Sequence, residues 1–243
     1  MEIEGIVLRV VPYKEKDAMI TVLSKDGLSS FLARGIFKID SKNALLTNLY
    51  TKAIFELTES KNGYFSLKSG KILNSSSLFM NDLETLLSLD ALGELLLKTS
   101  DQASANLLYP YVENGYNLLI EKKIDSLLFI TVIGIKYLMF NGYDMRVDGC
   151  VECGQKTKLV SFDFNSGGFL CHKHFDINKH TNQSPSYLRA VRHLFLVPEN
   201  KLDFLNISLT DVVLILAKTR EFMLDSCGIN WSGVESLIKC RRI

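Results

Sequence analysis

The segment EGIVLRVVPYKEKDAMITVLSKDGLSSFLAR, residues 4–34, decides how the chain begins to fold. It holds three short runs rich in apolar and β-branched residues, Glu4–Val11, Ala18–Leu23 and Leu28–Arg34. Asp26-Gly27 separates the second run from the third. Such a pair between apolar runs is a strong hairpin signal, because both residues tolerate positive φ. The segment therefore predicts consecutive β-strands joined by tight turns.

Further strand signals continue toward residue 78. Tyr50–Glu59 is a fourth run, Asn62-Gly63 is a second hairpin turn, and Tyr64–Leu73 supplies the last strand or two. About five short strands within residues 1–78 suit a small closed barrel, which leaves no strand edge exposed. An OB-fold barrel belongs to this class, and an SH3-like barrel fits the same periodicity.

From residue 79 onward the apolar residues recur at helical spacing. Asn81 or Asp82 can cap the first helix, since both residue types are favoured N-caps. Five further helical segments are expected at Ala103–Glu121, Ile124–Phe140, Pro185–Leu196, Thr210–Cys227 and Trp231–Lys239. Residues 79–149 and 180–243 are predicted to pack together as one all-α domain, with residues 150–179 inserted between them as a small module.

The composition is that of a globular intracellular protein. Apolar residues make up 47% of the 243 residues and only four are proline, so the chain can bury a sizeable core. The longest apolar stretch, Leu127–Phe140, is too short and too mixed for a membrane span. The start, MEIEGIVLRVV, carries glutamates where a secretory signal would carry positive charge. A cytoplasmic location without a membrane partner is expected.

The charge is unevenly distributed along the chain. The overall net charge is +1, but residues 1–78 carry a net +3, residues 79–149 a net −5 and residues 150–243 a net +3. Two mildly basic ends flanking an acidic middle indicate different partners for different segments, although ordinary surface variation produces imbalances of this size.

Three of the five cysteines fall in one cluster. Cys150-Val-Glu-Cys153 is followed, after a spacer of seventeen residues, by Cys171-His-Lys-His174. Zinc takes four tetrahedral ligands, and a C-x2-C turn presents two thiolates at a suitable separation. The pattern predicts one zinc ion held by Cys150, Cys153, Cys171 and His174. The ion is expected to be structural, because four protein ligands leave no open position for a catalytic water.

Two alternatives stay open for this cluster. His172 or His180 could replace His174 as the fourth ligand, and the three cysteines could instead be unligated buried thiols. A module of this size buries little core of its own, so ligation is expected to supply most of its folding free energy. Cys227 and Cys240 lie far along the chain and are expected to play no part in the site.

Two parts of the chain carry a likeness to a known family. Gly5-Ile-Val-Leu-Arg9, Pro12-Tyr13, Asp17 and the hairpin leading to Ala33-Arg34-Gly35 resemble the amino-terminal OB domain of the bacterial RecO proteins. The helical middle, the inserted cysteine module and the returning helices resemble the second half of that family in order and position. The likeness covers essentially the whole chain.

The resemblance implies an N-terminal OB-fold barrel followed by an all-α domain with an inserted zinc ribbon-like module. It implies a recombination mediator in DNA repair rather than an enzyme. RecO proteins bind single- and double-stranded DNA, anneal complementary strands and work with RecR and single-stranded-DNA-binding protein to load RecA. The resemblance also implies a peptide site: an apolar helical groove with a nearby Lys or Arg would receive the C-terminal tail of single-stranded-DNA-binding protein. Such a protein is expected in the bacterial cytoplasm, at the nucleoid during repair.

The chain departs from this family in two places. Members commonly carry an arginine-rich loop after the glycine that corresponds to Gly35, whereas Ile36–Lys42 holds two lysines and an aspartate. DNA affinity through this loop is therefore expected to be weaker. The fourth metal position is usually a cysteine, and here it is His174. Some members lack the metal site, so zinc is not required for the activity common to the family.

OB barrels bind single strands by combining a cationic groove with aromatic faces on which bases stack. The candidate stacking residues are Tyr13 and Phe37. The candidate cations are Arg9, Lys14, Lys16, Arg34, Lys38 and Lys42. The competing hypothesis is a protein-interaction scaffold that binds partner peptides and touches DNA only incidentally. No nucleophile motif or phosphate-binding glycine loop points to an enzyme.

Overall fold

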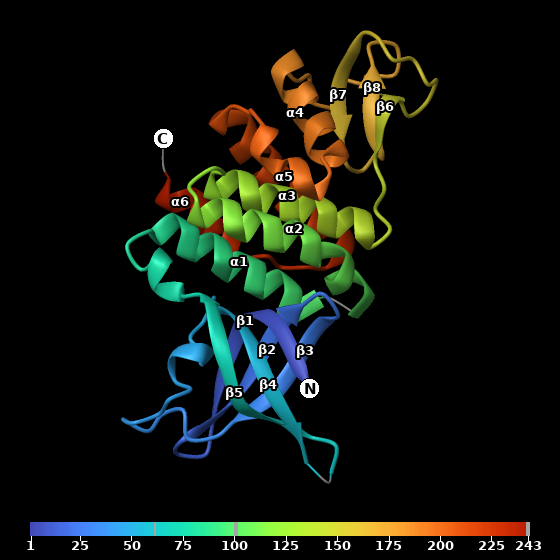
Figure 1. The fold of residues 1–243 in the computed structure, drawn as a ribbon. Helices are drawn as coiled ribbons and strands as arrows, with labels where there is room; N and C mark the ends of the chain where they lie inside the picture. The colour runs from blue at the N-terminus through green and yellow to red at the C-terminus, as the bar shows by residue number, and fades with distance from the viewer. Residues whose placement is uncertain (61, 100–101, 242–243) are drawn as a thin grey trace.

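The computed structural model of the chain describes residues 1–60, 62–99 and 102–241. A β-barrel occupies one end of an elongated molecule, a layer of helices the middle, and a small sheet with helix α4 (Pro185–Leu196) the other end (Figure 1). None of the described helices is long and apolar enough to cross a membrane.

Five strands close the N-terminal barrel in the order β1-β2-β3-β5-β4. All neighbouring strands are antiparallel except β3 and β5, which pair in parallel at Leu32 and Ser66. The strands are β1 (Glu2–Tyr13), β2 (Asp17–Ser24), β3 (Gly27–Ala33), β4 (Lys52–Glu59) and β5 (Phe65–Asn74). This closed five-stranded barrel confirms the predicted OB-like barrel. Alternating apolar residues on its strands fill the interior.

Two rings lie at the centre of the barrel. Phe31 and Phe55 are buried and tilted against each other, with ring centroids 5.2 Å apart. Gly70 has no side chain because a Cβ there would lie 2.4 Å from the carbonyl oxygen of Ile54 on the neighbouring strand. The close approach lets β4 and β5 curve around this core.

The middle layer is built around helix α3 (Ser126–Phe140), whose residues from Ser126 to Leu138 are all buried. A helix buried on all sides is apolar all round. Asp125 caps its start by accepting hydrogen bonds from two backbone N–H groups. The other α-helices are α1 (Leu83–Thr99), α2 (Gln102–Ile120), α4, α5 (Leu209–Cys227) and α6 (Gly233–Cys240), and short 3-10 helices span Leu45–Thr47, Ser76–Phe79 and Glu199–Phe204.

The predicted helices are found, and two of them start two residues later than predicted. Helix α3 begins at Ser126 rather than at Ile124. Asp82 caps α1 through a 3.0 Å bond from the backbone N–H of Thr85. The last helix begins at Gly233 rather than at Trp231. The indole of Trp231 is fully buried instead, and its N–H donates to the carbonyl oxygen of Ala91 at 2.7 Å. Trp231 therefore packs in the core just before the helix begins.

Barrel and helices are joined by buried polar contacts. Tyr116 of α2 donates its hydroxyl to the carbonyl oxygen of Tyr50 at 2.7 Å. Buried Lys52 of β4 lies 2.6 Å from Glu113 of α2 and 3.1 Å from Glu4 of β1. Charged groups in a buried contact need their partners, so these bonds fix how the barrel sits on the helical layer.

The inserted module is a three-stranded sheet in the order β6-β8-β7. Its strands are β6 (Arg146–Cys150), β7 (Leu159–Asp163) and β8 (Gly168–Cys171). Gly168 adopts φ +143°, and a Cβ there would lie 2.3 Å from the carbonyl oxygen of Arg146. Only glycine allows β8 to lie this close to β6.

The module is not isolated from the rest of the chain. Phe162, Phe164 and Phe169 belong to the same buried cluster as the helices. The sequence predicted that metal ligation supplies most of the folding free energy of the module. The structure adds packing against the helices as a second source of stability. The sheet also starts at Arg146, ahead of residue 150. The domain boundaries 1–78, 79–149 with 180–243, and 150–179 stay a prediction. The barrel has a buried cluster of its own, but a second cluster contains residues of all three parts.

Candidate metal centre and nucleic-acid interface

The first two cysteines sit on a tight turn at the end of β6. The backbone N–H of Gly154 donates to the carbonyl oxygen of Cys150 at 2.8 Å, and the N–H of Cys150 donates to that of Gln155 at 2.9 Å. Gly154 has φ +76°, a left-handed conformation that favours glycine. The turn brings both thiols close to Cys171 at the end of β8.

The second pair sits on a matching turn at the end of β8. The N–H of His174 donates to the carbonyl oxygen of Cys171 at 3.0 Å. The N–H of Val151 donates to Phe169 of β8 at 2.8 Å. Because β6 and β8 are neighbouring strands, their ends bring the two turns together.

The four side chains predicted as ligands meet at one point, and they could hold a metal ion. Their ligand atoms all lie within 4.8 Å of one another. Cys153 Sγ is 3.8 Å from Cys171 Sγ, and His174 Nδ1 is 3.5 Å from Cys150 Sγ and 3.4 Å from Cys171 Sγ.

These separations suit zinc. A tetrahedral zinc ion, with Zn–S bonds of about 2.3 Å and Zn–N bonds of about 2.0–2.1 Å, sets its sulfur ligands about 3.8 Å apart. The same geometry sets sulfur and nitrogen about 3.5 Å apart. A disulfide would need sulfur atoms about 2.05 Å apart. The donor set, three sulfurs and one imidazole, is also the one that structural zinc sites use.

The electrostatics of the cluster favour a bound cation. Burial raises the pKa of the Cys150 thiol, but backbone N–H groups, among them those of Cys171, Cys153 and Glu152, outweigh burial and lower the pKa to about 6. The neighbouring sulfur atoms of Cys171 and Cys150 raise the pKa of His174. Thiolates are the form that binds zinc. The pKa of the Cys171 thiol is lowered as well, whereas the neighbouring sulfur atoms of Cys150 and Cys171 raise the pKa of the Cys153 thiol, so two of the three thiols are held in the form that binds metal.

The other two candidate histidines do not join the cluster. His180 Nδ1 accepts the backbone N–H of Asp176 at 3.0 Å, and its Nε2 lies 3.3 Å from Ser166 Oγ. His172 is exposed and lies outside the group of possible ligands within the described chain. Cys227 and Cys240 are outside it as well.

Four of the predicted DNA-binding residues line one hollow on the barrel. The hollow has a volume of about 510 Å³. It is lined by Lys14, Glu15, Lys16, Asp17, Arg34, Gly35 and Lys38. Asp17 Oδ1 accepts the backbone N–H of Gly35 at 2.7 Å, and the carbonyl oxygen of Lys16 accepts that of Phe37 at 3.2 Å. These bonds hold the turn after β1 against the loop after β3.

The cations of this hollow outnumber its carboxylates and form no ion pairs with described residues. Among the ion pairs of the described residues, none involves Lys14, Lys16, Arg34 or Lys38. Glu15 and Asp17 are the acidic residues in the lining. A surface that keeps four cations without ion-pair partners favours an anionic ligand.

The remaining candidates lie elsewhere. Tyr13 is exposed, and the ammonium of Lys14 lies 5.3 Å from the centre of its ring. Phe37, also exposed, lines a second, apolar hollow of about 580 Å³ where the barrel meets the helices. Arg9 and Lys42 are exposed and line neither hollow. The side chain of Phe37 therefore lines a different hollow from the one that the main cations line.

Sequence reasoning missed the apolar hollow altogether. Leu49 and Met80 line it with Phe37, and all three are large exposed apolar side chains. Apolar side chains grouped on a surface mark an interaction site. These residues come from segments far apart in the sequence, so no local pattern shows that they lie together. The signal that the sequence offered was apolar residues within a polar loop, as at Leu49.

Two models of one protein family match most of the chain. A family model described as "Recombination protein O N terminal" matches residues 1–76, and one described as "Recombination protein O C terminal" matches residues 80–226. A DNA repair protein RecO of Listeria monocytogenes is 27% identical over 198 residues, covering 80% of this chain and 76% of its own. One of Bacillus mycoides is 30% identical over 182 residues, covering 71% and 70% respectively.

Proposed function

Since the chain belongs to the RecO family, we propose that it is a recombination mediator in DNA repair. In this proposal it binds single- and double-stranded DNA, anneals complementary strands and helps load RecA together with RecR. One observation carries the DNA-binding step: the hollow that gathers Lys14, Lys16, Arg34 and Lys38.

The hollow suits contact with the phosphate backbone. Ammonium and guanidinium groups on two rigidly joined loops can neutralise successive phosphates, and the release of counterions supplies the affinity. Phosphate contacts leave the bases unread. A protein that holds a strand in this way leaves the base edges free to pair with a second strand, which is what annealing requires.

Fluorescence anisotropy with a labelled single strand tests the proposal. We expect the double variant Arg34→Ala and Lys38→Ala to weaken binding at least tenfold. Lys25→Ala is the matched control, because Lys25 is exposed on the β2–β3 turn and lines a different hollow. Equal affinity of the double variant and the control would contradict the proposed interface.

We further propose that the four-ligand cluster holds one structural zinc ion. Zinc would be held by Cys150, Cys153, Cys171 and His174, and would supply a cross-link between the two turns rather than a reaction centre. The support is the fit of the measured separations to tetrahedral ligation. With all four positions filled by protein, the ion would have no site for substrate. We therefore infer a binding protein and not an enzyme.

The cellular setting follows from the family. We propose a bacterial cytoplasmic protein that joins the nucleoid during repair, with RecR and RecA as functional partners. The C-terminal tail of single-stranded-DNA-binding protein is the proposed peptide partner.

A protein-interaction scaffold is the second candidate function. It is favoured by the apolar hollow, where Phe37, Leu49 and Met80 are 50%, 43% and 73% exposed. Leu49→Ser combined with Met80→Ser would weaken peptide or partner binding under this hypothesis. The same pair of changes would leave DNA affinity unchanged, because neither residue lines the cationic hollow.

A further inference from the structure

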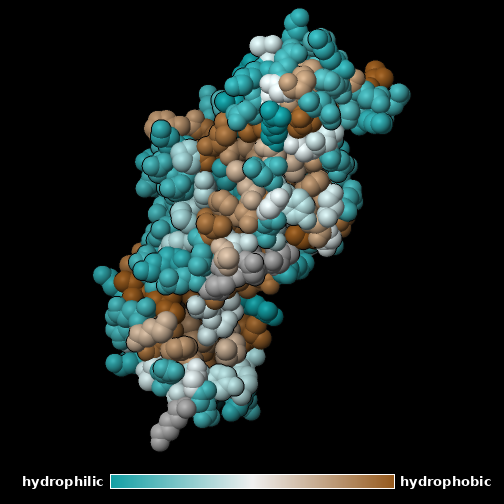
Figure 2. Space-filling view, turned by 90° about the vertical axis from the view of Figure 1, so that its right-hand side faces the viewer, coloured by the Kyte–Doolittle hydropathy of each residue, from teal (hydrophilic) through white to brown (hydrophobic). Residues whose placement is uncertain are grey.

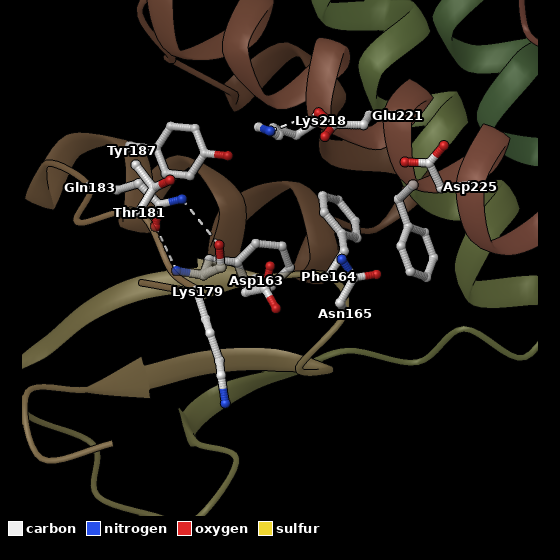
Figure 3. Close-up of a pocket in the computed structure, with 12 residues that line it drawn as sticks. Asp163, Phe164, Asn165, Lys179, Thr181, Gln183, Tyr187, Lys218, Glu221 and Asp225 are labelled. Atoms are coloured by element: carbon white, nitrogen blue, oxygen red, sulfur yellow. Dashed lines mark hydrogen bonds and ion pairs between the residues drawn. The ribbon is translucent and has the colours of Figure 1, made fainter. Parts of the chain in front are cut away.

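A pocket of about 200 Å³ lies between the inserted module and the helical layer. Its walls are the end of β7, the segment around residues 179–183, and helices α4 and α5 (Figure 3). Pockets for drug-sized ligands measure about 300–1,000 Å³. This pocket is smaller, so it suits a single side chain of a partner.

The pocket contains a buried hydroxyl without a partner. Tyr187 is 5% exposed, and its hydroxyl makes no hydrogen bond to any residue that the structure describes. Figure 3 shows this hydroxyl directed toward the side chains that line the pocket. A buried polar group without a hydrogen-bond partner costs free energy. A ligand that hydrogen-bonds to this hydroxyl would remove that cost, and its binding would be favoured.

The apolar part of the pocket is a rigid aromatic wall. The rings of Phe164 and Phe222 are stacked, with centroids 5.1 Å apart and planes 23° apart. Phe162 holds Phe164 edge-on at 5.0 Å, and Tyr143 holds Phe222 edge-on at 5.6 Å. A planar cation binds well on such rings, because aromatic faces carry negative charge.

One wall is held by an amide. The side chain of Gln183 accepts the N–H of Phe162 at 2.6 Å and donates to its carbonyl oxygen at 3.1 Å. Both ends of the amide are therefore engaged within the protein. Gln183 shapes the pocket and leaves the recognition of a ligand to other groups.

The charges that remain are acidic. Lys218 is paired with Glu221 at 2.7 Å. Lys179 extends away from the other labelled side chains (Figure 3) and lies 3.8 Å from Asp176. Asp225 forms no ion pair within the described part of the chain. Asp163 accepts one backbone N–H, from Ser166 at 2.7 Å, and forms no ion pair with described residues.

A phosphate or an acidic peptide tail would meet two uncompensated carboxylates in this pocket. Both ligands are therefore disfavoured. On the face that Figure 2 shows, hydrophilic residues cover much of this end of the molecule.

We propose that this pocket binds the guanidinium group of an arginine side chain presented by a partner protein. The planar group stacks on the ring of Phe164 or Phe222. Its N–H groups donate to the hydroxyl oxygen of Tyr187 or to a carboxylate of the lining, Asp163 or Asp225. Arginine suits the pocket better than lysine, because its flat fork of five N–H donors serves several acceptors at once.

A matched pair of small ligands tests the charge requirement. N-acetyl-argininamide carries the guanidinium, and N-acetyl-citrullinamide is its neutral isostere. We expect the first to cause saturable shifts in the backbone NMR signals of residues 163–166 and 181–187, with millimolar affinity, and the second to bind at least tenfold more weakly. Equal binding of the two, or shifts scattered over the surface, would overturn the proposal. Tighter binding of free L-arginine would do so too, since it would indicate an amino-acid site.

Variants of the full chain test the residues. Asp225→Asn is expected to weaken N-acetyl-argininamide binding at least threefold, and Tyr187→Phe about threefold. The Tyr187 variant should melt no lower than the original chain, because the lost hydroxyl has no partner. Glu59→Gln, an exposed carboxylate on the barrel, is the control and should bind normally. Unchanged affinity for N-acetyl-argininamide in both pocket variants would refute the site. DNA binding by the two pocket variants and the control is measured alongside, and it tests the proposed function separately.

Discussion

The salt dependence of DNA binding follows from the number of cations in the barrel hollow. Lys14, Lys16, Arg34 and Lys38 line it and form no ion pairs within the described chain. On a single strand each phosphate contact contributes a slope of about −0.7 to the plot of log affinity against log salt. Four contacts therefore give a slope of about −2.8, or a loss of about 50-fold between 50 and 200 mM salt.

Removing two of the four cations should halve that slope. For Arg34→Ala with Lys38→Ala the expected slope is about −1.4, which corresponds to a loss of about sevenfold over the same salt range. The fold should survive, since the two loops are joined through Asp17, Gly35, Lys16 and Phe37, and these bonds use none of the removed side chains. The assay is anisotropy titration of a labelled oligonucleotide at four salt concentrations, with two unrelated sequences. An unchanged slope in the variant, or a strong dependence on sequence, would refute phosphate contact at this hollow.

Three further changes probe stability. Cys153→Ser should release the bound zinc and lower the melting temperature, whereas Cys240→Ser, outside the cluster, should do neither; metal analysis with differential scanning fluorimetry decides this. Burial lowers the pKa of Lys136 from 10.5 to about 8. Between these two pH values the unfolded chain binds more protons than the folded chain, so the free energy of unfolding rises with pH. Relative to Lys136→Met, the original chain should therefore gain about 1–2 kcal/mol between pH 7.5 and 9.5 in urea titrations; no gain would contradict a depressed pKa. Gly134→Ala places a Cβ 2.7 Å from the ring of the chain's one tryptophan and should cost about 1–3 kcal/mol. Gly93→Ala, with its nearest contact at 3.7 Å, should be neutral or stabilising by up to about 1 kcal/mol; equal effects in the two glycine variants would argue against the packing explanation.

Local signals in the sequence predicted the elements well. The Asp26-Gly27 turn lies between β2 and β3, and helix α4 spans the predicted Pro185–Leu196. Strands and capped helices are specified by neighbouring residues, so they can be read from one sequence. The cysteine spacing likewise predicted which four side chains meet, because each pair sits on a short turn.

Features built from distant segments could not be read in the same way. The parallel pairing of β3 with β5 closes the barrel, and nothing near either strand specifies it. Trp231 precedes the apolar residues Val234, Leu237 and Ile238, which recur at helical spacing, yet its indole packs in the core against α1 and α3 instead of starting the helix. The pocket around Tyr187 joins β7 to α4 and α5. The unpaired state of its hydroxyl depends on all of their side chains at once.

The four-ligand cluster belongs to the module at one end of the molecule and the cationic hollow to the barrel at the other end (Figure 1), and this separation yields a discriminating prediction. The strand that ends in Cys171 pairs with β7, and β7 carries Asp163 and leads into Phe164 at the arginine pocket. Removal of zinc by a chelator should therefore loosen the pocket and abolish N-acetyl-argininamide binding. DNA affinity should change less than twofold, because the barrel has its own core around Phe31 and Phe55. Parallel loss of both activities on chelation would show that the zinc module supports the whole fold. Retention of both would show that packing of Phe162 and Phe169 against the helices holds the module without metal.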